Sequence, residues 1–170
     1  MSEKSFAIAL LFTGICAATA LPAQAERPDM ALLVKSLSAA SVSLDQGLKA
    51  SEAQGKPISG KFELENGVLQ LSVYVTKKGK FSEIVVDHES RSVSKTEPIT
   101  EGGDFKDANA QSKAMAKAKI SLEKAVQDTV TARPGYRALS AVPTLKAGHP
   151  VAEITLVNGA DIKTISRPLD

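Results

Sequence analysis

The feature that most constrains this chain is an internal repeat with an offset of 78 residues. The tripeptide Ser-Leu-Asp at 43–45 recurs as Ser-Leu-Glu at 121–123. A helix breaker follows each copy, Gly-Lys-Pro at 55–57 and Arg-Pro-Gly at 133–135, and strand-like sequence follows each breaker. This shared order indicates a duplicated unit, so the chain is expected to build one small architecture twice.

Each repeat opens with signals for a short helix. Ser43 is a favourable N-cap with Gln46 three residues later, which is the pattern of a capping box, and Ser121 caps the second helix. Asp45 and Glu123 lie in the first turns, where negative charge interacts favourably with the helix dipole. Apolar residues one turn apart form a stripe on each helix, Leu44 with Leu48 and Leu122 with Val126 and Val130. The lysine- and alanine-rich run at 113–124 is typical of an exposed helix.

Alternating apolar and polar residues after each breaker predict antiparallel strands. Strands are expected at 61–65, on both arms of a hairpin at 68–86, and at 136–145, 152–156 and 162–166. The Asn-Gly pairs at 66–67 and 158–159 are typical of tight hairpin turns. The expected fold class is α+β, with two similar units, each a helix packed on an antiparallel meander of three to four strands.

The chain divides into three expected segments. Residues 1–25 have the features of a secretory signal peptide: a lysine near the start, an apolar run, and Ala-Gln-Ala at 23–25. Residues 26–104 are expected to form the first repeat, and residues 105–170 the second. The polar stretch at 90–104 is expected to link them, or to add an edge strand at 93–99.

The signal segment sets the expected location and the available chemistry. Its apolar run is shorter than a bilayer span requires, so no membrane span is expected after cleavage, and the localisation is expected to be periplasmic or secreted. Cleavage also removes the single cysteine, Cys16, and with it any disulfide or thiol ligand.

Few residues are suited to catalysis or metal binding. The two histidines are His88 and His149. Consecutive residues of a strand alternate faces, so Asp-His-Glu at 87–89 is not expected to converge on one ion. The chain has neither a Gly-x-Ser-x-Gly elbow nor a glycine-rich phosphate loop. No catalytic residue, cofactor or metal site is therefore predicted, although folding can bring a serine, a histidine and an aspartate together from distant positions.

Charge and turn positions give the candidate contact residues. The net charge of +2 is too small for dependence on nucleic acid. It divides into −2 for residues 26–104 and +4 for residues 105–170. The residues expected to contact a partner protein are Tyr74, Lys77, Lys78, Lys80 and Asn158. The alternatives are cross-strand packing for the tyrosine and a solvated hairpin tip for the lysines.

The second repeat resembles the PepSY domain family. The resemblance is carried by Ile-Ser-Leu-Glu-Lys-Ala-Val at 120–126, Arg-Pro-Gly-Tyr at 133–136 and Gly-His-Pro-Val-Ala-Glu-Ile at 148–154. The first repeat is similar to a degenerate copy, with Val-Ser-Leu-Asp-Gln-Gly at 42–47 and Ile-Val-Val-Asp at 84–87, but it lacks the Pro-Gly break. The second copy differs from the family pattern, because its last strand ends without the aspartate that follows this strand in the family.

PepSY domains occur in the propeptides of thermolysin-type secreted metallopeptidases and in many small secreted bacterial proteins. The resemblance implies a non-enzymatic module that inhibits or regulates a peptidase or another extracytoplasmic protein. The alternative from a different class is a small secreted hydrolase with an unrecognised active site. The oligomeric state and the identity of the partner are left open.

Overall fold

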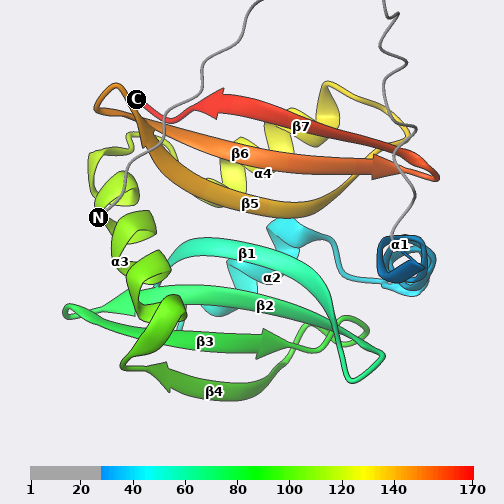
Figure 1. Ribbon diagram of the computed structural model, residues 1–170, viewed down its shortest axis with the longest axis horizontal. Coiled ribbons are helices and arrows are strands. Elements are labelled where there is room, and N and C mark those ends of the chain that lie inside the picture. Colours follow the sequence, from blue (N-terminus) through cyan, green and yellow to red (C-terminus); the bar gives the residue numbers. More distant parts are fainter. Residues whose placement is uncertain (1–27) are drawn as a thin grey trace, which may run out of the picture.

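A computed structural model describes residues 28–170, and the predicted signal peptide at 1–25 lies outside the described residues. The described chain contains four helices and seven strands (Figure 1). In chain order these are α1 (Pro28–Ala39), α2 (Leu44–Ser51), β1 (Lys56–Glu65), β2 (Val68–Lys77), β3 (Lys80–Val86), β4 (Val93–Ile99), α3 (Gly102–Lys117), α4 (Leu122–Thr131), β5 (Arg137–Lys146), β6 (His149–Asn158) and β7 (Asp161–Pro168).

All seven strands belong to one antiparallel sheet with the order β4-β3-β2-β1-β5-β6-β7. The fold class is therefore α+β, as predicted, but the sheet is larger than the three- to four-stranded meanders expected. Strand β1 pairs with β5 through Gly60 opposite Ala141 and Lys61 opposite Ser140. A strand left at an edge carries unpaired N–H and C=O groups, and this short pairing joins β1 and β5 through part of their facing edges.

The two short helices predicted from the repeat cover one face of the sheet. Helices α2 and α4 begin directly after Ser43 and Ser121, as expected. The Ser43 N–H donates to Gln46 Oε1 at 3.1 Å, and Ser121 Oγ accepts from the Lys124 N–H at 3.2 Å. Gly60 lies beneath α2 so closely that a Cβ there would be 3.1 Å from a Leu48 methyl group.

The core lies between these helices and the sheet. Its largest fully buried side chains include Leu44, Leu48, Leu71, Ile84, Leu122, Ile154 and Leu156. Alternation along the strands directs Leu71, Ile84, Ile154 and Leu156 to the α2–α4 face, where they pack against the leucines of the two helices. Burial of this apolar surface is the main stabilising contribution to the fold.

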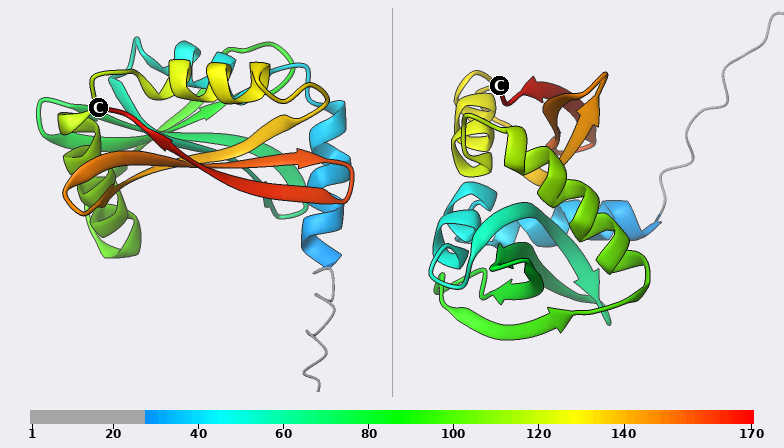
Figure 2. Two further views of the ribbon diagram at one scale, coloured as in Figure 1. Left: turned by 90° about the horizontal axis from the view of Figure 1, so that it is seen from above. Right: turned by 90° about the vertical axis from the view of Figure 1, so that its left-hand side faces the viewer.

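Helices α1 and α3 lie on the opposite face, at the two ends of the strands (Figure 2). Helix α3 packs across β1, β5 and β6, and Ser59 Oγ donates to Gln111 Oε1 at 2.8 Å in this contact. Helix α1 contacts β1 and β2 and buries Leu37. Helices α2 and α4 thus cover the inner strands on one face of the sheet, while the edge strands β4 and β7 stay largely exposed, and on the second face a helix covers each end. None of the described helices is both long and apolar enough to cross a membrane.

Candidate functional site

A single row of side chains crosses all seven strands on the face that carries α1 and α3. Its members face one another in register from strand to strand: Lys95, Val85, Ser72, Lys61, Ser140, Thr155 and Thr164. Seven strands spaced about 4.8 Å apart give this row a length of roughly 29 Å. We call the surface formed by these seven residues the hydroxyl row, because four of them are serine or threonine.

The neighbouring residues on β1 show which face of the sheet the hydroxyl row occupies. Ser59 lies two residues before Lys61 and contacts α3, whereas Gly60 between them points toward α2. Lys61, Lys95 and Thr164 are exposed, and Ser140, Thr155 and Val85 are half-buried, whereas Ser72 is buried. The row therefore presents hydroxyl and ammonium groups at the surface on β4, β1, β5, β6 and β7.

Ion pairs lie along this face beside the hydroxyl row. Lys61 and Glu63 are 2.7 Å apart, and Lys95 and Glu97 are 2.9 Å apart. Toward the β7 edge, Lys146 approaches Glu153 at 2.5 Å and, with Ser166, holds the pKa of that carboxyl below its usual range. Exposed pairs of this kind contribute little to stability. Their charged groups can therefore exchange partners when another surface approaches.

Tyr74 lies on the same face but beneath α3. Its side chain is only 9% exposed, and its hydroxyl donates to Asp104 Oδ1 at 2.9 Å. Burial, and then the hydrogen bond to Asp104, raise the pKa of Tyr74 well above its ordinary value. The ring therefore packs within the molecule and offers little surface to a partner.

The raised pKa of Tyr74 predicts a loss of stability at alkaline pH. The protonated Tyr74 hydroxyl contributes to the free energy of unfolding. This contribution is complete below pH 10, the ordinary pKa of a tyrosine in the unfolded chain, and is lost as the pH rises toward the higher pKa of the folded state. We expect the free energy of unfolding, measured with urea, to decrease more steeply from pH 9 to pH 11 in the native chain than in the Tyr74→Phe variant. The variant has no hydroxyl to ionise at this position. Equal slopes in the two proteins would contradict this assignment.

The other predicted contact residues lie at opposite ends of the strands. Lys77, Lys78 and Lys80 form the exposed tip between β2 and β3. Asn158 lies at the turn between β6 and β7, where its amide packs 3.2 Å from the position of a Cβ on Gly135. The structure therefore does not bring these residues into one site.

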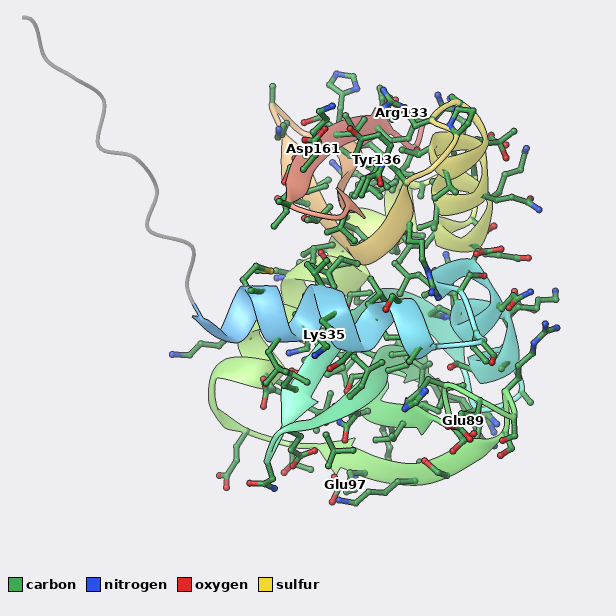
Figure 3. The ribbon with its side chains drawn as sticks, turned by 90° about the vertical axis from the view of Figure 1, so that its right-hand side faces the viewer. Lys35, Glu89, Glu97, Arg133, Tyr136 and Asp161 are labelled. Carbon is green, nitrogen blue, oxygen red and sulfur yellow. The ribbon has the colours of Figure 1, made fainter. Side chains whose placement is uncertain are left out.

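A polar cluster that the sequence did not predict lies at the β6–β7 turn, where Asn158 is opposite Asp161; Tyr136 and Asp161 of this cluster are labelled in Figure 3. The Tyr136 hydroxyl donates to Asp161 and accepts from Lys163, and Lys163 Nζ lies 2.8 Å from Asp161 and 4.8 Å from the centre of the Tyr136 ring. Lys163 and Tyr136 hold the pKa of Asp161 below its usual range. Tyr136 belongs to the Arg-Pro-Gly-Tyr motif of the second repeat, but no local pattern relates it to β7.

The two histidines are far apart in sequence and share no contact partner. His149 Nδ1 is 2.7 Å from Asp170 Oδ2, and His88 Nδ1 is buried without a hydrogen-bond partner. In residues 28–170, neither ring forms a hydrogen bond with a serine or threonine hydroxyl. The described residues also contain no group of three or more histidine, cysteine, aspartate or glutamate side chains suited to a metal ion.

One open cavity of about 350 Å³ lies among the ends of four elements on the other side of the molecule. It is lined by Glu52, Gly55, Lys56, Pro57, Met115, Ser121, Leu122 and Glu123. Within it, Lys56 Nζ donates to the Met115 carbonyl at 2.9 Å and so caps the end of α3. This bond connects the start of β1 to the end of α3.

Comparison with known proteins gave no match: the sequence matches no family model, no curated protein, and no solved structure.

Proposed function

We propose that this chain is a non-enzymatic, PepSY-like binding module of the periplasm or cell exterior, which inhibits or regulates a peptidase or another extracytoplasmic protein. The observation that carries the proposal is the hydroxyl row, whose exposed or half-buried polar members lie on β4 and on β1, β5, β6 and β7, with Val85 of β3 and the buried Ser72 of β2 between them. A surface of this kind suits reversible contact with a folded partner, because its groups remain solvated when the partner is absent.

The joining of the two repeats supports this proposal. We propose that α2 with β1 to β4 and α4 with β5 to β7 are the two copies of the duplicated unit, related through the contact of β1 with β5. Half of the sheet alone would offer a row of three or four residues. In the joined sheet the row is roughly 29 Å long. One partner contributes ~800 Å² to a standard interface, and a square patch of that area has a side of ~28 Å, which is close to the length of the row.

The test is affinity capture from a periplasmic or culture extract, with residues 26–170 as bait in three forms. These are the native chain, an open-face variant (Thr155→Arg with Thr164→Arg), and a control variant with the same added charge on the exposed side of α4 (Gln127→Arg with Thr131→Arg). We expect the native and control chains to retain the same protein, and the open-face variant to retain at least tenfold less. Two arginines at the β6–β7 end of the hydroxyl row would separate the surfaces there.

The activity of the captured protein then distinguishes regulation from catalysis. A binding module changes that activity saturably at a fixed stoichiometry, and the bait is unchanged at the end. Turnover of a substrate by the bait would instead support the hydrolase alternative. Equal capture by the native chain and the open-face variant would overturn the assignment of the hydroxyl row as the contact surface.

A further inference from the structure

The β2–β3 tip and α3 lie together at one end of the sheet (Figures 1 and 2), and both carry lysines. We call this group the basic end surface; its members are Lys77, Lys78, Lys80, Lys106, Lys113 and Lys117. All six are exposed. In the part of the chain that the structure describes, none of the six forms an ion pair. Elsewhere, six other lysines do pair with carboxylates: Lys49, Lys61, Lys95, Lys124, Lys146 and Lys163.

Helix geometry places the α3 lysines on one outward stripe. Lys106, Lys113 and Lys117 are separated by seven and four residues, so they share a face one above another. The opposite face of α3 is buried against the sheet through Ala108, Gln111, Ala114 and Met115. The stripe therefore has no role in the packing of this domain beyond the bond from Lys117 Nζ to the Gly148 carbonyl at 3.1 Å.

An aromatic contact fixes the hairpin next to this helix. Phe81 follows Lys80 at the base of the tip, and its ring meets the Phe105 ring edge-on with centroids 5.6 Å apart. Phe105 precedes Lys106 in the first turn of α3. The two groups of lysines are thus parts of one surface rather than independent charges.

The acidic residues of the same region do not neutralise this surface. Asp104 accepts the Tyr74 hydroxyl, and Glu101 and Asp107 are exposed near the start of α3. Asp170 lies beside the end of α3 and pairs with His149. Six ammonium groups against these four side-chain carboxylates leave an excess of positive charge. Like charges held close together repel one another, and an opposing acidic surface would remove that repulsion.

We propose that the basic end surface docks an acidic segment of the partner protein, an inference that rests on the proposed function of the chain as a binding module. The positive charge is complementary to an acidic partner. A protein is favoured over a membrane as that partner, because α3 buries its apolar face and leaves no apolar stripe to enter a lipid interface. It also favours a protein over nucleic acid. The surface contains no arginine for bidentate phosphate contacts, and Phe105, 38% exposed, is held against Phe81.

The experiment measures binding of residues 26–170 to a fluorescently labelled poly-L-glutamate peptide at low and physiological salt. The docking variant carries Lys106→Gln, Lys113→Gln and Lys117→Gln. The control carries Lys35→Gln, Lys49→Gln and Lys124→Gln, which change the net charge equally on α1, α2 and α4. We expect binding that weakens with salt, a loss of about tenfold in the docking variant, and a change of about twofold or less in the control.

Three results would overturn this inference. The first is the absence of poly-L-glutamate binding at low salt. The second is an equal loss in the two variants, which would show that net charge alone is responsible. The third is tighter binding to phosphatidylserine-containing vesicles or to a single-stranded oligonucleotide than to poly-L-glutamate. The open-face variant is expected to bind poly-L-glutamate like the native chain, so failure here is separable from failure of capture through the hydroxyl row.

Discussion

Replacing Ile154 with alanine is expected to lower the free energy of unfolding by about 2–5 kcal/mol. Ile154 is fully buried in β6, opposite Ala141 of β5 and Ile165 of β7, on the face covered by α2 and α4. Neighbours on adjacent strands cannot collapse freely into the space left by the lost methyl groups, so a cavity adds to the lost burial. Urea unfolding followed by circular dichroism measures the change.

The matched control is the same substitution at Ile162. This side chain lies at the start of β7 and is 41% exposed on the other face of the sheet. Ile162→Ala is therefore expected to cost less than about 1 kcal/mol. Similar losses at the two positions would contradict the assignment of the two faces, on which both the core and the hydroxyl row depend.

The elements that the sequence predicted well are those set by local chemistry. Ser43 and Ser121 start α2 and α4 because a side chain and a few backbone groups within one turn decide a helix start. The Asn66-Gly67 turn between β1 and β2 also formed as predicted, with φ of 52° and 79°, which these two residue types adopt readily.

Other features depend on contacts between distant residues. In the 90–104 stretch, the edge strand given as the alternative at 93–99 is present as β4, which pairs with β3, and the stretch also contains the start of α3, so little of it is a linker. The pairing of β1 with β5 joins Gly60 to Ala141, and neither residue carries a pattern that selects the other. The sequence predicted meanders of three to four strands and left open whether the two sheets join, and the seven-stranded sheet is larger than these meanders.

The candidate site likewise combines features set by local sequence with features set by contacts between distant residues. Alternation along β2 correctly put Tyr74 on the polar side of the strand, but Asp104 and α3, which cover it, come from 30 residues later. Ser72, Ser140 and Thr155 are ordinary strand residues when taken singly. They become one row only when both repeats share a sheet, and this is why sequence reasoning named turn tips rather than the open face.

Replacing Arg137 with methionine is expected to release α1 from the rest of the fold and to cost about 1.5–3 kcal/mol. Arg137 begins β5, and its guanidinium donates to the Leu37 carbonyl at 2.6 Å and to the Val42 carbonyl at 3.1 Å. These bonds satisfy carbonyl groups at and just after the end of α1, across about 100 residues of chain. Burial lowers the pKa of the guanidinium, yet an arginine remains charged.

Methionine keeps much of the aliphatic packing and removes only the donors, so the effect reports on these bonds. Hydrogen exchange is expected to accelerate in α1 more than in α2 or α4, because only α1 loses a direct partner. The control is Arg133→Met, which removes one longer bond to the Thr129 carbonyl at 3.3 Å, and is expected to cost less than about 1 kcal/mol while leaving α1 protected. Unchanged exchange in α1 of the Arg137 variant would show that the packing of Leu37 alone holds this helix at the end of the open face.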